Sequence, residues 1–261
     1  MEHRLLTCNA AQFPPCFHSY IQGAAIYDSS CSNAAQVFFL DKEDGFYLKT
    51  APKGTLQKEA ELYRYFHMLG YAPEVVSYES LESDWLLTVR AKGDDCIAPH
   101  HLADPTRLTD TVAQALRMLH ETSPKGCPAP NHTATYLATA RKNYLSGCFD
   151  PDMFPQAQRI ANKEEAWRIV EENGSRLQTD TLLHGDYCLP NIILHNWKFS
   201  SFIDLDHAGV GDRHVDIFWA LWSLEFNLKT DRFRDRFLDA YGRDLVDETR
   251  LQTVAAIEVF G

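Results

Sequence analysis

The stretch LLHGDYCLPNIIL, residues 182–194, places a histidine, an aspartate and an asparagine between two apolar runs typical of buried strands. These polar residues are His184, Asp186 and Asn191. A charge and an amide are costly to bury unless they have partners. The pattern therefore indicates either solvated turn residues or groups that are held in place for chemistry.

The residues that follow predict a hairpin, which favours the second possibility. Residues 191–196 and 198–206 form two short strands with a turn between them. In an antiparallel pair with a short turn, the outer strand ends come together. Asp186, Asn191 and Asp204 are therefore expected to converge on one small volume. Two carboxylates and an amide oxygen are hard ligands, which suit Mg²⁺ and are poor for zinc.

The spacing within this motif favours phosphoryl transfer. The step of five residues from Asp186 to Asn191 is the spacing of the protein-kinase catalytic loop, and the residues around Asp204 read I-D-L-D where a kinase has D-F-G. Phosphoryl transfer from a nucleotide needs a divalent metal that bridges the phosphates and a carboxylate that orients the accepting hydroxyl. The predicted convergence would supply both.

The first third of the chain is predicted to be rich in strands. Residues 36–40 and 46–50 flank the turn signal Asp44-Gly45, and residues 74–78 and 85–89 form a second such pair. Between the pairs, residues 55–70 carry apolar side chains at helical spacing and end at Gly70. The predicted order is hairpin, helix, hairpin, with a boundary near residue 91.

The rest of the chain is predicted to be mainly helical. Helical patterns cover residues 108–122, 162–174, 230–242 and 247–260, with N-caps at Asn162 and Thr230. Asp216 is interpreted as a further N-cap that ties its loop to the following helix. We therefore predict an N-terminal nucleotide-binding lobe over residues 1–91. A C-terminal helical lobe over residues 92–261 would hold the catalytic loop, the metal site and the acceptor site.

Two residues of the first third complete a kinase-like pattern. In such folds a strand lysine grips the nucleotide phosphates and pairs with a helix glutamate. Lys49 lies on a predicted strand, with Tyr47 on the same face, and the next helix offers Glu59, with Glu61 as a close alternative. Taken alone, Lys49 would be a solvated charge at a strand end. In order with the hairpin motif, it is predicted to bind phosphate.

Composition limits the class of protein. With 45% hydrophobic and 23% charged residues among 261, the chain is typical of a soluble globular protein. The formal net charge of −11 argues against a nucleic-acid binder, which should carry a basic stripe. The sequence shows no apolar run of membrane-spanning length and no secretory leader pattern, so we expect a cytoplasmic protein. The seven scattered cysteines are expected to be free thiols.

The ordered set of motifs resembles the aminoglycoside phosphotransferases, most closely the aminoglycoside 3'-phosphotransferases. The resemblance runs from about Ser29 to Phe260 and is firmest in residues 116–128, 184–194 and 199–217. It implies an α+β, two-lobe, protein-kinase-like fold, in which a small antiparallel sheet with one helix precedes a larger helical lobe. It also implies Mg²⁺-dependent transfer of the γ-phosphoryl group of ATP, with GTP possible, to a hydroxyl of a polycationic aminoglycoside, at the 3' position.

The resemblance gives each motif residue a role. Asp186 would be the catalytic base or the carboxylate that orients the hydroxyl, and Asn191 and Asp204 would hold Mg²⁺. The implied nucleotide contacts are Ser32, Asn33, Ala34, Tyr47, Lys49, Glu59, Thr88, Val89 and Ala91. The implied acceptor contacts are Asp150, Asp152 and Glu258.

Alternatives stay open on the sequence alone. The same fold would serve a kinase of another small alcohol, such as choline, homoserine or a sugar. A nucleotide-binding protein without catalysis is disfavoured because every expected catalytic residue is present. A protein kinase is disfavoured because the segment between Asp204 and Asp216 is too short to seat a peptide. The expected assembly is a monomer or a homodimer, with neither nucleic acid nor membrane as a partner.

Overall fold

The computed structural model describes residues 4–8, 10–31, 35–150, 160 and 162–260. The chain divides into two compact units, the N-terminal unit Met1–Lys92 and the C-terminal unit Gly93–Gly261. The division falls one residue after the boundary expected from the sequence.

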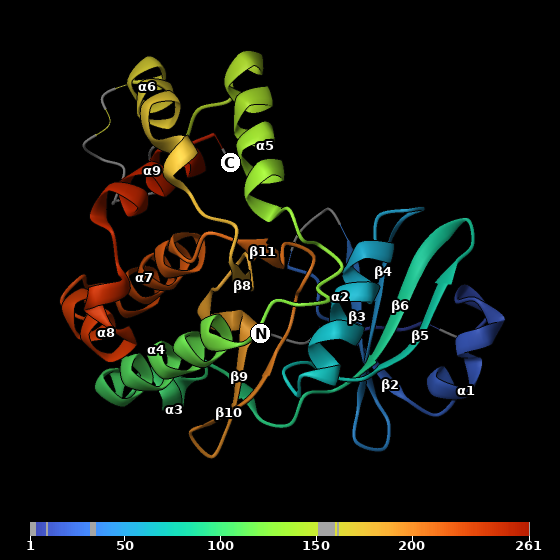
Figure 1. The fold of residues 1–261 in the computed structure, drawn as a ribbon. Helices are drawn as coiled ribbons and strands as arrows, with labels where there is room; N and C mark the ends of the chain where they lie inside the picture. The colour runs from blue at the N-terminus through green and yellow to red at the C-terminus, as the bar shows by residue number, and fades with distance from the viewer. Residues whose placement is uncertain (1–3, 9, 32–34, 151–159, 161, 261) are drawn as a thin grey trace. The chain divides into compact units, whose positions relative to one another are not determined.

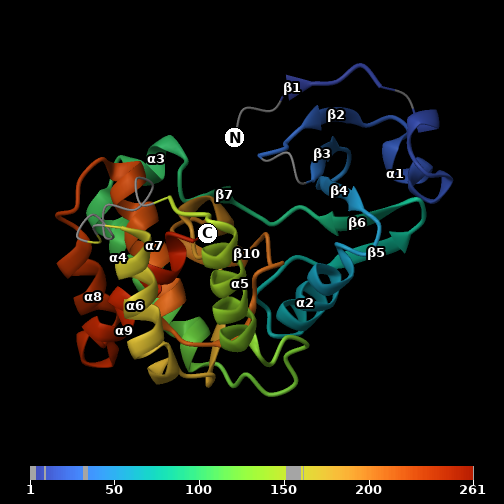
Figure 2. The same cartoon turned by 90° about the horizontal axis from the view of Figure 1, so that it is seen from above.

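The N-terminal unit is built on a six-stranded antiparallel sheet with the strand order β1-β2-β3-β4-β6-β5. The strands are β1 Arg4–Leu5, β2 Ala25–Asp28, β3 Gln36–Asp41, β4 Phe46–Pro52, β5 Val75–Ser80 and β6 Ser83–Val89. Figure 2 shows the strands in this order, with helix α2 (Gln57–Met68) beside β5. The predicted order of hairpin, helix and hairpin is confirmed by β3 to β6 and α2.

The expectation of a single helix in this unit was incomplete. A short helix α1 (His18–Ile21) follows two 3₁₀ turns, Ala10–Gln12 and Pro15–Phe17. Strands β1 and β2 also lie at the edge of the sheet without having been predicted. These elements have only two to four residues each, so they carry too few side chains to show a period.

The core of the N-terminal unit determines which way the functional side chains point. Its buried cluster takes Leu48 from β4 and Leu87 from β6, together with Phe13, Phe17, Ile21, Ile26, Phe38 and Leu40. Side chains alternate between the two faces of a strand. Tyr47 and Lys49, which flank Leu48, therefore share the opposite face of the sheet.

The C-terminal unit is mainly helical. Its helices are α3 Pro99–Leu102, α4 Pro105–Glu121, α5 His132–Ser146, α6 Lys163–Asn173, α7 His214–Leu228, α8 Arg234–Tyr241 and α9 Glu248–Glu258. Two small antiparallel sheets complete it: β7 Asp94–Asp95 with β9 Ile192–His195 and β10 Lys198–Phe202, and β8 Thr181–Leu183 with β11 Gly209–Gly211. Figure 1 shows α9 (red) packed between α6 and α7.

Most of the predicted helices form, and one of their two predicted N-caps is confirmed. Asn162 caps α6 as expected, since its side chain accepts a hydrogen bond from the N–H of Glu165 at 2.9 Å. The cap predicted at Thr230 is wrong, because α8 begins at Arg234 and Phe233 occupies the N-cap position. Among the described residues, no helix is long and apolar enough to cross a membrane.

Candidate active site

The predicted hairpin forms and sets two of the site residues side by side. Strands β9 and β10 pair antiparallel, with Ile192 opposite Phe202. One step further out, the N–H of Ile203 donates to the carbonyl of Asn191 at 3.0 Å. Asp204 follows Ile203 directly, so the strand pairing places it next to Asn191.

Asn191 also holds Asp186. Its amide nitrogen Nδ2 donates to Oδ2 of Asp186 at 2.8 Å and to the Asp186 carbonyl at 3.1 Å. Because both bonds use the nitrogen, the amide oxygen Oδ1 points away from Asp186. The structure therefore brings Asp186, Asn191 and Asp204 together, as the motif spacing predicted.

The backbone of Asp204 has an uncommon conformation. Its φ is 60°, in the left-handed region that residues other than glycine rarely adopt. Such a conformation costs on the order of 1–3 kcal/mol and persists where the surrounding structure enforces it, often at functional sites. Its side chain is exposed. The strained backbone therefore presents an accessible carboxylate beside Asn191.

His184 ties the Asp186 loop to the strand that leads to Asp204. Its Nε2 lies 3.0 Å from the carbonyl of Ile203, and its Nδ1 lies 3.3 Å from the N–H of Asp186. The neutral ring with its proton on Nε2 satisfies both contacts, because a carbonyl must accept and an N–H must donate. The next residue, Gly185, has a φ of 84°, and a Cβ there would come within 2.0 Å of the His207 carbonyl. Only glycine fits.

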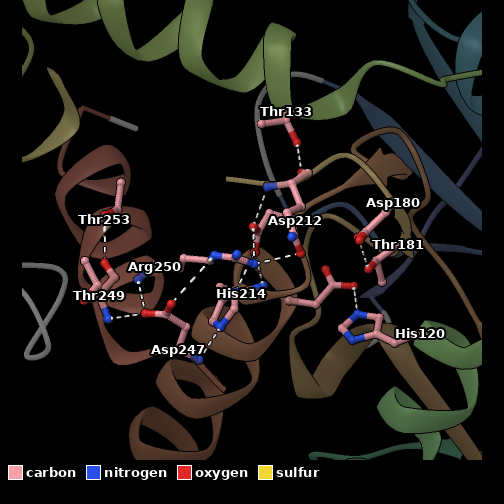
Figure 3. Close-up of polar contacts among 12 residues, drawn as sticks. His120, Thr133, Asp180, Thr181, Asp212, His214, Asp247, Thr249, Arg250 and Thr253 are labelled. Carbon is pink, nitrogen blue, oxygen red and sulfur yellow. Dashed lines mark hydrogen bonds and ion pairs between the residues drawn. The ribbon is translucent and has the colours of Figure 1, made fainter. Parts of the chain in front are cut away.

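The side chain of Asp216 also holds this loop, through its backbone N–H groups. Its Oδ2 accepts from the N–H of His184 at 2.8 Å and its Oδ1 from the N–H of Gly185 at 2.7 Å. The ring of His120 also donates to Oδ2, at 3.0 Å (Figure 3). Burial alone would raise the pKa of Asp216, but the hydrogen bond and positive potential of His120 outweigh it, so the pKa lies below the ordinary value. The N-cap interpretation of Asp216 is wrong, since it lies inside α7 and binds the loop instead.

Two further residues that were not predicted anchor this loop. The hydroxyl oxygen of Ser223 on α7 accepts a hydrogen bond from the N–H of Leu189 at 2.9 Å. The hydroxyl of Tyr187 donates to the carbonyl of Val112 on α4 at 2.8 Å. Both contacts join residues far apart in the chain, and no local pattern marks them. Together with Asp216 they fix the loop on two helices.

The donor chemistry of this group fits Mg²⁺. Asn191 offers an amide oxygen and Asp204 a carboxylate, and hard oxygen ligands are those that Mg²⁺ prefers. Within the described ranges, no group of three His, Cys, Asp or Glu side chains is close enough to bind a metal by itself. A site with two protein oxygens suits an ion that keeps several waters and takes its other ligands from phosphates.

In the N-terminal unit, Lys49 and Glu59 form an ion pair. Nζ of Lys49 lies 2.9 Å from Oε1 of Glu59, whose side chain is 1% exposed. The alternative, Glu61, is exposed and accepts a hydrogen bond from Gln57 of the same helix. The structure thus selects Glu59. Tyr47 lies on the same face as Lys49, with its ring centroid 5.1 Å from that of Phe39.

The predicted hinge residues lie at the end of β6. Thr88 is buried and pairs with Tyr47 across the ladder. The N–H of Val89 donates to the carbonyl of Glu74 at 3.1 Å, so it is already used within the unit. Within the part of the chain that the structure describes, the N–H of Ala91 makes no hydrogen bond.

Of the predicted acceptor residues, Glu258 lies at the C-terminal end of α9. Glu258 is 7% exposed, and its Oε1 accepts from the hydroxyl of Tyr136 at 2.6 Å and from the indole N–H of Trp219 at 3.1 Å. None of the described residues donates to its Oε2. Burial, with a smaller contribution from the negative charge of Asp186, raises the pKa of Glu258 to about 7.

The backbone of Asp150 lies beside the end of α9. Its backbone N–H donates to the carbonyl of Val259 at 2.8 Å, and its side chain is exposed. The remaining predicted residues, Ser32, Asn33, Ala34 and Asp152, lie outside the described residues.

The chain is similar in sequence to known phosphotransferases. The model of the phosphotransferase enzyme family matches residues 28–252. A probable aminoglycoside 3'-phosphotransferase of Lactococcus lactis is 48% identical over 257 residues, which cover 98% of each chain. An aminoglycoside 3'-phosphotransferase of Niallia circulans is 29% identical over 218 residues, which cover 82% of this chain and 83% of the relative.

Solved structures confirm the fold. The crystal structure of an aminoglycoside 3'-phosphotransferase of type VIII has a TM-score of 0.74 and 23% identity, with 96% of each chain covered. An aminoglycoside phosphotransferase of Streptomyces rimosus, in complex with ADP and streptomycin, has a TM-score of 0.71 and 22% identity, with 86% of this chain and 90% of that chain covered. The predicted α+β, kinase-like fold is therefore correct.

Proposed function

The chain belongs to the phosphotransferase enzyme family, and from this premise we propose that it is an ATP- and Mg²⁺-dependent kinase of aminoglycoside antibiotics. The γ-phosphoryl group would pass to the 3' hydroxyl, as the names of the two relatives described above suggest. One observation carries the catalytic part of the proposal. The side chain of Asn191 binds Asp186, and its backbone carbonyl accepts a hydrogen bond from Ile203, the residue before Asp204.

The proposed nucleotide contacts come from the N-terminal unit. Glu59 holds the ammonium group of Lys49, which would contact the phosphates of ATP. Tyr47 would stack near the adenine. The unused N–H of Ala91 would donate to the base edge, and the N–H of Val89, which Glu74 engages, would not.

The proposed chemistry lies in the C-terminal unit. Asn191 and Asp204 would hold Mg²⁺, which when bound neutralises charge on the phosphates. Asn191 fixes the orientation of the Asp186 carboxylate, so that this group can accept the hydrogen bond of the acceptor hydroxyl. It would take the hydroxyl proton as the oxygen bonds to the γ-phosphorus and the bond from that phosphorus to the departing ADP breaks. The hydrogen bonds that His184 accepts from the N–H of Asp186 and that Asp216 accepts from the N–H of Gly185 keep this loop in place before substrate binds.

The proposed acceptor contact is electrostatic. Aminoglycosides carry several ammonium groups, which require carboxylates nearby. Oε1 of Glu258 is engaged by Tyr136 and Trp219, and its Oε2 would accept an ammonium group. Asp150, beside the end of α9, would add a second negative charge. Asp152, which the resemblance also implies as an acceptor contact, would add to the choice of antibiotic.

A substrate panel tests the proposal directly. Release of ADP by the purified protein would be measured with kanamycin, neomycin, an aminoglycoside that lacks the 3' hydroxyl, choline and homoserine. We expect turnover only with the aminoglycosides that carry the 3' hydroxyl. Turnover of choline or homoserine alone would replace the proposed acceptor, and no turnover with any acceptor would overturn the proposed activity.

The variant Asp186→Asn is the matched control for this assay. It preserves size and removes the charge, so kcat should fall by about a thousandfold while nucleotide affinity changes little. Loss of nucleotide binding in this variant would assign Asp186 a different role.

A further inference from the structure

A second group of buried polar residues lies between the Asp204 segment and the C-terminal helix. Its centre is a contact between Asp212 and His214, each 1% exposed (Figure 3). Oδ1 of Asp212 lies 2.5 Å from Nδ1 of His214 and accepts from the His214 N–H at 2.9 Å. Oδ2 accepts from the N–H of Gln178 at 2.7 Å. The carboxylate is thus fixed from both sides.

The other edge of the His214 ring binds a different segment. The N–H of Asp247 donates to Nε2 of His214 at 2.8 Å. An amide N–H can only donate, so Nε2 carries no proton and the proton is on Nδ1, where Asp212 accepts it. One neutral ring therefore bridges two segments: the stretch that follows Asp204 and β11, and the residue that precedes α9.

Asp247 is itself the N-cap of α9. Its Oδ1 accepts from the N–H groups of Thr249 at 2.8 Å and Arg250 at 3.2 Å. Arg250 then reaches back to the side chain of Gln178, at 2.8 Å. The side chain of Asp247 thus caps the first turn of α9, and its backbone N–H attaches that turn to His214.

The other end of α9 carries Glu258. Between the two ends, the buried side chains of α9 are Leu251, Thr253, Val254, Ala255, Ala256 and Ile257. Apolar packing of this kind is non-directional, whereas a hydrogen bond fixes distance and direction. The polar contacts at the two ends, His214 with Asp247 and Glu258 with Tyr136, therefore add fixed points to this packing.

We propose that His214, held by Asp212, is a positioning residue for the acceptor site. It positions α9 through the hydrogen bond with the N–H of Asp247. The position of α9 in turn determines the position of the Glu258 carboxylate. This inference rests on the proposed function, in which Glu258 binds an ammonium group of the acceptor. It predicts that His214 affects the acceptor and leaves the nucleotide unaffected.

Two substitutions separate the two hydrogen bonds of the ring. In His214→Gln the amide reaches as far as Nε2 did, so its oxygen can still accept from the N–H of Asp247. In His214→Asn the shorter amide reaches only as far as Nδ1, so the contact with Asp212 is kept and the contact with α9 is lost. The change of Gln252, an exposed residue of α9, to Ala serves as the control.

For His214→Asn we expect the KM for the acceptor to rise about tenfold, the effect of one lost buried hydrogen bond, with kcat and the KM for ATP within about twofold of the parent. His214→Gln should restore the acceptor KM to within about threefold of the parent. Equal acceptor KM values in the two variants, or a parallel loss of nucleotide binding, would overturn the proposal.

Hydrogen exchange tests the same contact without substrate. The amide of Asp247 should exchange faster in His214→Asn than in the parent and in His214→Gln, and an unchanged rate would overturn the proposal. If the parent phosphorylates no acceptor, the proposed function fails, while the exchange rates still decide whether His214 holds α9.

Discussion

Asn191 uses the two ends of its amide for different tasks. The nitrogen is committed to Asp186 by two hydrogen bonds, and the oxygen takes part in neither of them. Aspartate at this position would keep the oxygen ligands but lose the donor, and its charge would repel Asp186. The choice of an amide is therefore explained by its having one donor end and one acceptor end.

A change at Asp204 tests the proposed metal site. Asp204→Asn keeps the shape and removes the charge that would neutralise Mg²⁺, so turnover should fall at least about a hundredfold. Part of the loss should return as Mg²⁺ is raised, because weaker binding is offset by concentration. Initial rates across a Mg²⁺ series measure this. Asp206→Asn, two residues away, is the control, and near-parent turnover by Asp204→Asn at ordinary Mg²⁺ would exclude the proposed role.

Glu258 predicts a pH dependence of acceptor binding. Burial raises its pKa from 4.5 to about 7, so the carboxylate is protonated below about pH 7 and ionised above it. Only the ionised form attracts an ammonium group, and the acceptor KM should therefore rise by up to about tenfold per pH unit as the pH falls below 7. KM measured from pH 5.5 to 8.5 checks this, with Glu258→Gln expected to show a flat profile. A profile shared by both proteins would contradict the assignment.

The same raised pKa has a consequence for stability. A carboxyl group whose folded pKa exceeds its unfolded value favours the folded state when protonated. Between pH 4.5 and about 7, the contribution of Glu258 to the free energy of unfolding therefore decreases as the pH rises.

At the scale of elements, the placement of α2 depends on one buried carboxylate of β6. Asp84 is 0% exposed; its Oδ2 accepts from the N–H of Leu56, the N-cap of α2, at 3.0 Å, and its Oδ1 from the hydroxyl of Ser80 at 2.7 Å. Burial would raise the pKa of Asp84, but these hydrogen bonds outweigh it and lower the pKa. Asp84 thereby holds the helix that presents Glu59 to Lys49.

We therefore expect Asp84→Ala to lower the free energy of unfolding by about 2–3 kcal/mol, because the buried N–H of Leu56 and the partly buried hydroxyl of Ser80 lose their acceptor. In the parent, the contribution of Asp84 should be complete above about pH 4, the unfolded pKa, and lost as the pH falls through the lower folded pKa. Urea unfolding at several pH values measures both effects. Glu82→Ala, at an exposed position of the same hairpin, should change little, and a similarly small effect of Asp84→Ala would refute the expectation.

Some elements and contacts could be predicted from the sequence and others could not, for physical reasons. Helices α2 and α4 bury one face, so their apolar side chains recur at helical spacing. In β3 and β9 successive residues are buried, and these strands were recognised as apolar runs beside turn residues. Helix α5 was missed because its buried residues are few, Thr133 and Ala140. The site was predicted where it is local in the chain, as for Asp186 and Asn191. The contacts of Asp216, Ser223 and His214 are long-range, and no local pattern marks them.

At the scale of the whole molecule, the net charge of −11 affects its two proposed substrates in opposite ways. A polycationic acceptor is attracted and a polyanionic nucleotide is repelled over distances of the Debye length, about 10 Å at 0.1 M salt. Raising NaCl from 0.05 to 0.5 M should therefore increase the acceptor KM several-fold and leave the KM for ATP unchanged or lower. Steady-state kinetics at five salt concentrations measure both constants. An acceptor KM independent of salt would show that only short-range contacts bind the acceptor.

The hairpin between Asn191 and Asp204 has a consequence for how this stretch can vary in evolution. Its turn has two residues with positive φ, Asn196 and Trp197, and its ladder shifts register between Phe199 and Ser201. The number of residues in each strand therefore decides whether Asp204 arrives beside Asn191 or on the other face of the sheet. Substitutions can be tolerated at many positions of this stretch, whereas insertions and deletions within either strand should be purged by selection.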